Sequence, residues 1–273
     1  MNVAQHAKFT SIDGDIFVTV ADTGARLQKY DPDTLSDMAA WVDMLDATDD
    51  VLTLTVAKFR ALGSIALSAD DVVTLADTGA NLASLTPAEL VAAGAAGIDK
   101  INATNNTLSL TVEQYRAISG TIGLNSKDTV TLADTGANLA GLSQAEVAAL
   151  ATSFVDRFDA TDGTLGLSLA QLQAMGTVAL AKADLVTLTD TGAEISALLP
   201  EQLGGLSAKG VDRLDITDGA VTLTRAQVLA LGTVTFEASD MVVMTGADLA
   251  KLTPDQIYGL WANGVDRFDA SND

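Results

Sequence analysis

A tandem repeat constrains the fold of this 273-residue chain more than any other feature of its sequence. The clearest marker reads Val-Thr-Leu-Ala-Asp-Thr-Gly-Ala in its most regular form. Its aspartates are Asp22, Asp77, Asp134 and Asp190, which gives a period of about 56 residues, typical of stacked repeat proteins. A shortened fifth copy at 242–247 lacks the aspartate. Because tandem units of this length bury their apolar faces only against their neighbours, we expect the array to be the folding unit.

A second marker alternates with the first and reads Val-Asp-Arg-Phe-Asp-Ala-Thr-Asp-Gly at 155–163. Both markers alternate apolar and polar residues and end in turn residues, which predicts strands. Capping residues follow each marker and predict helix starts. The expected N-caps are Asp31, Thr55, Thr86, Thr111, Ser143, Ser168, Thr224 and Thr253, whereas Leu199 lacks a capping hydroxyl. Gly63, Gly120, Gly176 and Gly232 stand where helix ends favour a left-handed residue.

The unit therefore reads strand, helix, short strand, strand, helix, and strands joined through helices favour parallel pairing. We predict an α/β fold, a right-handed β/α solenoid of about 56-residue tandem repeats with a parallel sheet and outer helices. The predicted array covers residues 1–273 as one domain. Its repeats are about 18–72, 73–129, 130–185 and 186–241, with a partial repeat at 242–273 and a partial N-terminal repeat at 1–17. Because the sequence stops within a repeat, we expect a longer parent array.

The charge and the residue types exclude several classes of function. The chain has 36 acidic and 15 basic residues, a net charge of −21, so binding to nucleic acid or to anionic membrane surfaces is not expected. There is no cysteine and one histidine, His6, which excludes disulfides, thiolate catalysis and histidine-based triads. No apolar run is long enough for a membrane-spanning helix, so no membrane insertion is expected. The first residues also lack the pattern of a Sec signal peptide.

The pattern resembles the Leu/Ala-rich β/α repeats of very large secreted bacterial proteins, which often accompany calcium-binding repeats of the RTX type. The resemblance rests on the segments Val73–Leu82 and Val130–Leu139 and on the second marker. It implies a type I-secreted or surface protein, located outside the cell or on its surface. The Gly-Gly-x-Gly-x-Asp nonapeptide itself is absent, so its calcium sites do not transfer. A looser likeness connects the chain to leucine-rich-repeat solenoids.

The Asp-Thr-Gly in the first marker also matches the catalytic motif of aspartic proteases. That chemistry needs two aspartates that share one proton. Here four interchangeable copies each lead into a capped helix. We therefore interpret the aspartate as an acceptor of backbone N–H groups and the glycine as the residue of an unusual backbone conformation.

Acidic residues in the second marker admit two interpretations. The oxygen-rich spacing of Asp156, Asp159, Asp162, Asp212, Asp215 and Asp218 is compatible with calcium, the one cofactor considered. Alternatively, arginine and aspartate columns on the outer face of the sheet form a neutralising ladder that could also meet a ligand. The residues of this ladder face are Arg157, Asp159, Arg213, Asp215, Arg267 and Asp269. We favour the ladder.

These features predict a protein without catalysis: a structural or adhesive segment of a large secreted protein, acting as a stiff acidic scaffold. The alternative is a module that binds calcium, glycan or protein through the Arg/Asp/Thr face. The expected partners are neighbouring repeats and, beyond them, glycan or protein. Trp41 and Trp261 each fall near the end of a predicted helix, in the first and last repeats, and we expect a core or end-packing role for both.

Overall fold

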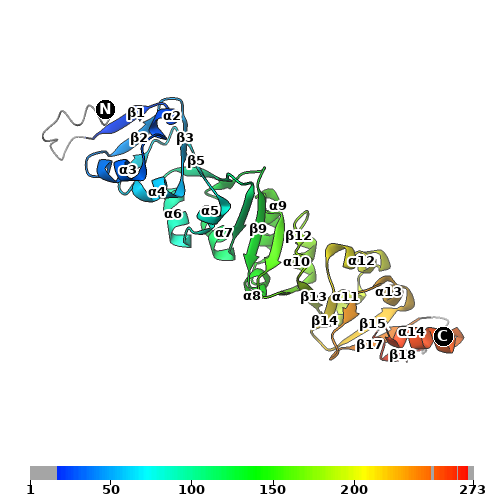
Figure 1. The fold of residues 1–273 in the computed structure, drawn as a ribbon. Coiled ribbons are helices and arrows are strands. Elements are labelled where there is room, and N and C mark those ends of the chain that lie inside the picture. The colour runs from blue at the N-terminus through cyan, green and yellow to red at the C-terminus, as the bar shows by residue number, and fades with distance from the viewer. Residues whose placement is uncertain (1–16, 247–248, 263, 270–273) are drawn as a thin grey trace. The chain divides into compact units, whose positions relative to one another are not determined.

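The structure, a computed structural model, describes residues 17–246, 249–262 and 264–269 of the chain (Figure 1). It forms two compact units, Met1–Leu132 and Ala133–Asp273. Both units contain the same succession of short strands and short helices. The prediction of a single array over the whole chain stays a prediction.

The first unit contains nine strands, the last of which runs across its boundary. The strands are β1 (Thr19–Asp22), β2 (Met44–Ala47), β3 (Val51–Leu54), β4 (Ala66–Leu67), β5 (Val72–Asp77), β6 (Ile98–Ala103), β7 (Thr107–Leu110), β8 (Gly123–Leu124) and β9 (Thr129–Asp134). Its helices are α2 (Gly24–Leu27), α3 (Pro32–Met38), α4 (Val56–Ala61), α5 (Gly79–Ala83), α6 (Pro87–Ala95) and α7 (Val112–Ile118). These counts refer to the described residues.

The second unit repeats this order. Its strands are β10 (Arg157–Ala160), β11 (Thr164–Leu167), β12 (Ala179–Leu180), β13 (Leu185–Asp190), β14 (Arg213–Ile216), β15 (Ala220–Thr224), β16 (Thr235–Phe236), β17 (Met241–Thr245) and β18 (Arg267–Asp269). Its helices are α8 (Gly136–Ala140), α9 (Gln144–Thr152), α10 (Leu169–Ala174), α11 (Gly192–Ser196), α12 (Pro200–Gly204), α13 (Arg225–Ala230), α14 (Pro254–Ala262) and the 3-10 turns η1 (Ser207–Lys209) and η2 (Leu249–Lys251).

Two kinds of half-unit alternate along the chain. A long half-unit consists of one strand and two helices, as in β5, α5 and α6. A short half-unit consists of two strands, one helix and a short strand, as in β6, β7, α7 and β8. Helices of successive half-units pack together in pairs: α3 with α4, α6 with α7, α9 with α10 and α12 with α13. Successive half-units, and not whole repeats, therefore pack against one another.

The strand pairings within each unit are all parallel, which confirms the predicted α/β class with parallel sheets. In the first unit the sheet β3-β5-β6-β8 shows the rule, and β11-β13-β14-β16 repeats it in the second. Thr53 of a short half-unit pairs with Thr74 of the long one, which pairs in turn with Lys100. Residues one full repeat apart, such as Arg157 in β10 and Arg213 in β14, lie in different sheets. Strand pairing therefore joins successive half-units and not successive repeats.

The predicted helix ends are confirmed. The side chains of Asp31, Thr55, Thr86, Thr111, Ser143, Ser168 and Thr224 accept hydrogen bonds at the helix N-termini, and Thr253 accepts one from Gln256. Leu199 makes no side-chain cap. The C-terminal glycines Gly63, Gly120, Gly176 and Gly232 have φ values of 54°, 78°, 57° and 62°. These features depend on local sequence alone.

Two elements were missed by the sequence prediction. The Asp-Thr-Gly marker starts a helix at once, with Thr78 as the N-cap of α5. The second marker bends at a turn and continues into a further strand, so that β6 is followed by β7 and β10 by β11. The turn residue has positive φ, as at Asn106 (57°) and Gly163 (75°). Both elements are shorter than the window over which periodicity becomes visible.

The glycine of the first marker has a different function from the one predicted. The φ angle is not positive at any of the four marker glycines, Gly24, Gly79, Gly136 and Gly192. Instead, a Cβ atom on Gly79 would lie 1.9 Å from the carbonyl oxygen of Thr107. The corresponding distances at the other three glycines are 1.8, 1.8 and 2.0 Å. Close contact with the backbone of a neighbouring half-unit, and not an unusual φ, requires glycine here.

Buried glutamines connect three of the short half-units to the long half-unit before each of them. Gln114, Gln171 and Gln227 occupy the third position of a capping box, and each is between 7 and 9% exposed. The Gln171 Oε1 accepts a hydrogen bond from the Ser168 amide at 2.9 Å, while its Nε2 donates to the carbonyl oxygens of Ala140 (2.8 Å) and Leu142 (2.6 Å). Both polar atoms of the side chain are satisfied, which makes burial of the amide tolerable.

Candidate functional site

The aspartates of the Asp-Thr-Gly marker bind backbone amides. The Asp77 Oδ1 accepts from the Thr78 amide at 2.8 Å and from the Asn81 side chain at 2.7 Å, and its Oδ2 accepts from the Val56 amide at 3.1 Å. Burial raises the pKa of Asp77, but the three hydrogen bonds outweigh it and the pKa is lowered. Asp190 has the same contacts with the amides of Thr191 and Leu169. This is the amide-accepting role predicted for the marker, and it differs from a proton-sharing pair.

Three of the six aspartates considered for calcium accept hydrogen bonds from backbone amides. Asp162 and Asp218 accept from the amides of Gly136 and Gly192 at 2.9 and 2.8 Å, and Asp212 accepts from Val186 at 2.8 Å. Each bond joins neighbouring half-units. Asp156 lies just before β10, and Asp159 and Asp215 lie partly exposed within β10 and β14. Among the described residues, no group of three or more His, Cys, Asp or Glu could hold a metal ion.

Calcium should therefore leave the stability of the chain nearly unchanged. We expect about 1 mM calcium, added in roughly 0.15 M salt that already screens the net charge of −21, to shift the melting temperature by no more than about 1 °C. Thermal melts with calcium, with magnesium and with a chelator test this. A saturable rise with calcium alone, lost in Asp218→Asn, would restore the calcium site.

The predicted ladder of arginine and aspartate is corrected by the strand register. Phe158 and Ala160 point inward, so Arg157 and Asp159 lie on the outer face as expected. However, Arg213 has Thr187 and Thr235 beside it on the neighbouring strands, because half-units and not full repeats are adjacent. Its ion-pair partner is Glu237, which directly follows β16. The outer face thus carries separate polar contacts in place of a continuous ladder; Arg267 and Asp269 lie in β18.

Four buried aspartates escaped the sequence analysis. Asp71, Asp128, Asp184 and Asp240 are 5 to 8% exposed and end the turn before each long half-unit strand. Each Oδ2 accepts one amide of an earlier strand, such as that of Ala47 at 2.9 Å for Asp71. The Oδ1 atoms of Asp71 and Asp128 are buried without a hydrogen-bond partner. Their recurrence once in every repeat was visible in the sequence, but their burial was not.

Asp71→Asn should remove a pH-dependent loss of stability. Burial raises the pKa of Asp71; the hydrogen bond from the Ala47 amide opposes this, and the carboxylates of Asp46, Asp50 and Asp49 add to it. A pKa above the unfolded value of about 3.9 means that unfolding free energy falls as pH rises from the unfolded to the folded pKa. We expect Asp71→Asn to be at least as stable as the parent at pH 7 and to lack that fall. Urea denaturation between pH 3 and 7 measures it. A variant clearly less stable at pH 7 would contradict this account, and exposed Asp70→Asn is the matched control.

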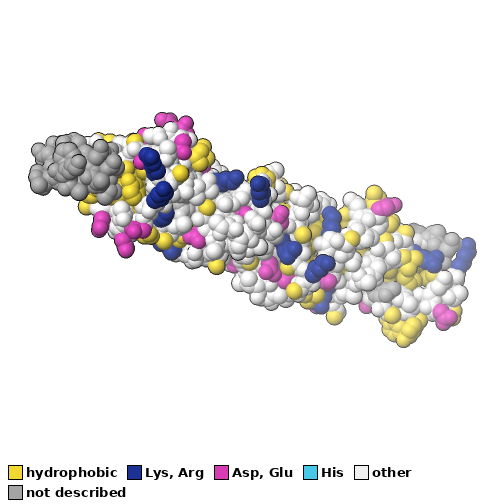
Figure 2. Space-filling model, turned by 45° about the horizontal axis from the view of Figure 1, so that its top comes forward, with side chains coloured by type: hydrophobic (Ala, Val, Ile, Leu, Met, Phe, Trp, Pro, Cys, Tyr) yellow, Lys and Arg dark blue, Asp and Glu magenta, His cyan; other side chains and the backbone are white. Residues whose placement is uncertain are grey.

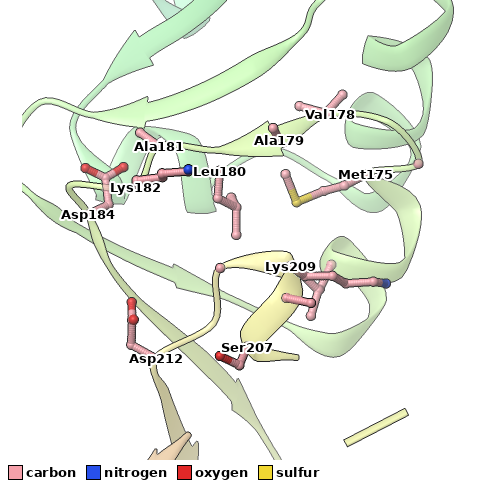
Figure 3. Close-up of a pocket in the computed structure, with 14 residues that line it drawn as sticks. Met175, Val178, Ala179, Leu180, Ala181, Lys182, Asp184, Ser207, Lys209 and Asp212 are labelled. Atoms are coloured by element: carbon pink, nitrogen blue, oxygen red, sulfur yellow. The ribbon is translucent and has the colours of Figure 1, made fainter. Parts of the chain in front are cut away.

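One cavity of about 480 Å³ lies in the second unit between the end of α10, β12 and the turn η1 (Figure 3). Its wall includes the apolar side chains of Met175 and Leu180, and Lys182 extends over Leu180. Lys209 lies on the opposite wall, and no described residue forms a hydrogen bond or ion pair with either ammonium group. The Asp184 carboxylate in the wall is already bound to the Ala160 amide. The cavity offers cationic and apolar groups for binding.

The face of helix α14, which we define by Ile257, Tyr258 and Trp261, is the most aromatic exposed surface of the described chain. These side chains are 40, 71 and 65% exposed. A core role for Trp261, one of the two predicted for the tryptophans, is therefore wrong, whereas Trp41 is half-buried. The face of the molecule drawn in Figure 2 shows acidic and basic side chains interspersed with apolar ones.

The counterparts of Ile257 in the earlier repeats are all buried. Leu35, Leu90, Val147 and Leu203 hold the same place, three residues after the first residue of the helix, and are at most 1% exposed. Their helices are covered by the helix of the next short half-unit. Among the described residues, only β18 follows α14. The α14 face is thus a helix-packing face that solvent reaches.

Comparisons with known proteins do not identify a family for this chain. No protein-family model matches the chain, and no curated protein matches it. Among solved structures, the chain is similar to 2,3-dimethylmalate lyase, a PEP mutase/isocitrate lyase superfamily member, with a TM-score of 0.18 and 11% identity over 93% of this chain and 75% of that chain. A likeness of this size carries no argument about fold or activity.

These findings correct the predictions that depended on the family resemblance. The assignment to repeats of secreted bacterial proteins is corrected, because no family model and no curated protein matches the chain, so no such family is identified. The adhesive scaffold, its alternative of ligand binding through the sheet face, and the exclusion of an enzyme are withdrawn with it. Calcium, glycan, the lack of nucleic-acid binding and an extracellular location stay predictions. In the described part of the chain, no helix is long and apolar enough to cross a bilayer.

Proposed function

We propose that the chain is a right-handed tandem-repeat solenoid that binds a partner protein through the α14 face. Support for the solenoid comes from the parallel register, in which each half-unit pairs with the next one along the chain. Aspartates accept hydrogen bonds from backbone amides of the preceding half-unit, and glutamines donate hydrogen bonds to its carbonyl oxygens, at corresponding places in successive repeats. The right hand follows from the general preference of parallel crossover connections.

The observation that carries the binding function is the exposure of Tyr258 and Trp261 on one helix face. Tryptophan and tyrosine dominate the binding energy of protein interfaces because they bury large areas at little entropic cost. The adjacent Ile257 extends the same face, and Leu260 behind it anchors the helix in the core at 4% exposure. The aromatic side chains are therefore held on a fixed support, as interface residues usually are.

Selection of binding peptides from a displayed library of helical peptides tests this function on the whole chain. We expect the enriched peptides to lose at least about tenfold in affinity, or ~1.4 kcal/mol, with Trp261→Ala and with Tyr258→Ala. Leu229→Ala is the matched control, because Leu229 is 57% exposed on α13, away from this face. Enriched peptides that bind all variants equally, or a selection that enriches none, would overturn the proposal.

A further inference from the structure

One junction in the second unit departs from the repeat, namely the one between the short half-unit of α10 and the long half-unit of α12. Helix α12 has 5 residues, whereas its counterparts α6 and α9 have 9 each. Gly204 and Gly205 stand where α6 has Val91 and Ala92, and glycine loses more backbone freedom in a helix than any other residue. The helix at this junction is therefore shortened from 9 to 5 residues, by about one turn.

The same junction lacks an ion pair that joins two helices at its counterpart in the first unit. There, the Arg60 Nε of α4 donates to the Glu89 Oε1 of α6 at 2.7 Å. The corresponding residues of α10 and α12 are the uncharged Gln173 and Gln202, and the Gln202 Oε1 accepts from the Leu199 amide at the start of its own helix. Both glutamines line a cavity of about 190 Å³. A cavity thus lies where the first unit has an ion pair.

Two lysines at this junction replace small side chains of the other repeats. The other short half-units carry one of three residues in place of Lys182: Ala69, Ser126 or Ala238. The second and third long half-units carry Ala96 and Ser153 in place of Lys209. In a repeat array, residues that serve the packing of one unit on the next recur from unit to unit. Side chains that occur at one junction therefore indicate a role other than packing.

Both lysines line the cavity of about 480 Å³ that is drawn in Figure 3, and Lys209 also lines the smaller cavity. The larger volume lies within the range of ligand sites in proteins, roughly 300–1,000 Å³. Its apolar wall includes Met175 and Leu180, which adjoin the lysines. Neither ammonium group has a hydrogen-bond or ion-pair partner in the described part of the chain. The cavity therefore combines apolar surface with unpaired positive charge.

The charged groups of this cavity are arranged by sign. In Figure 3, Asp184 and Asp212 lie at one end, Lys209 lies at the other, and Lys182 extends from the acidic end over Leu180. The Oδ2 atom of each aspartate already accepts a backbone amide. Asp212 is exposed, so its Oδ1 is free to accept a further hydrogen bond. The wall thus offers a carboxylate at one end, two ammonium groups farther along, and apolar surface between them.

We propose that this cavity binds a short apolar peptide with both ends free, at a place separate from the α14 face. The ammonium group of the peptide lies against Asp212, its carboxylate lies against Lys182 and Lys209, and its side chains pack on Met175 and Leu180. An amphipathic carboxylate would match the lysines but leave its apolar tail against the aspartates, and an amphipathic amine would do the reverse. A free amino acid carries both charges on one carbon atom and so matches one end alone.

Blocked forms of one peptide test the two charges separately. We expect Leu-Ala-Leu to bind the intact chain with a Kd of roughly 0.1–1 mM. The N-acetylated peptide, the C-amidated peptide and free leucine should each bind at least about threefold more weakly, which is the value of one exposed ion pair. Methionines labelled with carbon-13 in the methyl group report the place of binding. The Met175 resonance, assigned with Met175→Leu, should shift, and that of Met38, buried in the first unit, should not.

Variants connect each charge to its partner. Lys182→Met and Lys209→Met should each weaken Leu-Ala-Leu by about threefold and leave the C-amidated peptide unchanged. Asp212→Asn, whose side-chain oxygen can still accept the Val186 amide, should weaken Leu-Ala-Leu and leave the N-acetylated peptide unchanged. Lys127→Met is the matched control, because it removes an exposed lysine from the turn before β9, outside the cavity. It should change no affinity.

Three results would overturn the inference. A Met175 resonance that stays unshifted up to about 5 mM Leu-Ala-Leu, well above the expected Kd, would exclude the site. An N-acetylated or C-amidated peptide that binds as tightly as Leu-Ala-Leu would exclude a ligand with both ends charged. Equal losses with Lys127→Met and Lys182→Met would show that the net charge of the chain, and not the cavity, governs the affinity. None of these results bears on Trp261 or Tyr258, so the proposed function is tested separately.

Discussion

Replacing Gly79 with alanine is expected to destabilise the chain by about 3 kcal/mol or more. The added Cβ would lie 1.9 Å from the Thr107 carbonyl oxygen and 3.0 Å from its carbon. Both atoms belong to backbone, so no rotamer change relieves the overlap. The shift would also disturb the hydrogen bond from the Gly79 amide to the Asn105 side chain, 2.9 Å long. Urea denaturation followed by circular dichroism measures the loss.

Gly123→Ala is the matched control for this prediction. Gly123 lies in strand β8, and a Cβ there would have the Asp99 carbonyl oxygen as its nearest neighbour at 3.5 Å, an ordinary contact. We expect it to change stability by less than about 1 kcal/mol, because alanine is also easier to order in a strand than glycine. If Gly79→Ala were as mild as Gly123→Ala, the close contact of the two backbones would be wrong.

Gln171→Glu should cost about 3 kcal/mol at pH 7, because two buried carbonyl groups would lose their partners at about 1–3 kcal/mol for each unsatisfied group. The glutamine Nε2 donates to the carbonyl oxygens of Ala140 and Leu142, and a carboxylate can donate to neither. Both carbonyl groups would also face a negative charge. The capping bond from the Ser168 amide survives in the variant. The loss therefore isolates the contact between half-units from the capping of the helix.

The pH dependence of the stability of Gln171→Glu provides a second measurement of the same contact. Below the pKa of the new carboxyl group the protonated form can donate one hydrogen bond, so part of the loss should return as the pH falls towards about 4. Gln173→Glu is the control, since Gln173 is exposed on the same helix. We expect it to change stability by less than about 0.5 kcal/mol. A Gln171→Glu variant as stable as Gln173→Glu would show that the two carbonyl contacts contribute nothing.

Features that depend on neighbouring residues were predictable from the sequence. The capping residues Thr86 and Ser143 and the left-handed Gly120 work through bonds between residues close in the chain, so their patterns carry the whole signal. The parallel α/β class followed from strands separated by helices. The repeat period of about 56 residues was equally clear from the sequence. What the period alone did not show was that each repeat contains two stacked half-units.

Features that depend on contacts between half-units were missed. No local pattern indicated that Gly79 lies against Thr107 of the next half-unit, or that Gln171 reaches the carbonyl groups of an earlier turn. The ladder of Arg213 and Asp215 failed for the same reason, because its predicted columns joined residues of strands that lie in different sheets. A core or end-packing role was expected for Trp261 because of its size, but burial depends on the packing of neighbouring half-units. Alignment of the repeats could have signalled this, since Ala39, Gly94, Ala151 and Ser207 stand where the last repeat has Trp261.

The alternation of long and short half-units limits how the gene for this protein can change length. The Gln171 amide of a short half-unit fits the two-helix turn of the long one before it, at Ala140 and Leu142. Duplication or deletion of a whole repeat preserves every such match. Loss of one half-unit would place two half-units of the same kind in succession and leave the glutamine and the carbonyl groups without each other. Lineages of this protein should therefore differ by even numbers of half-units.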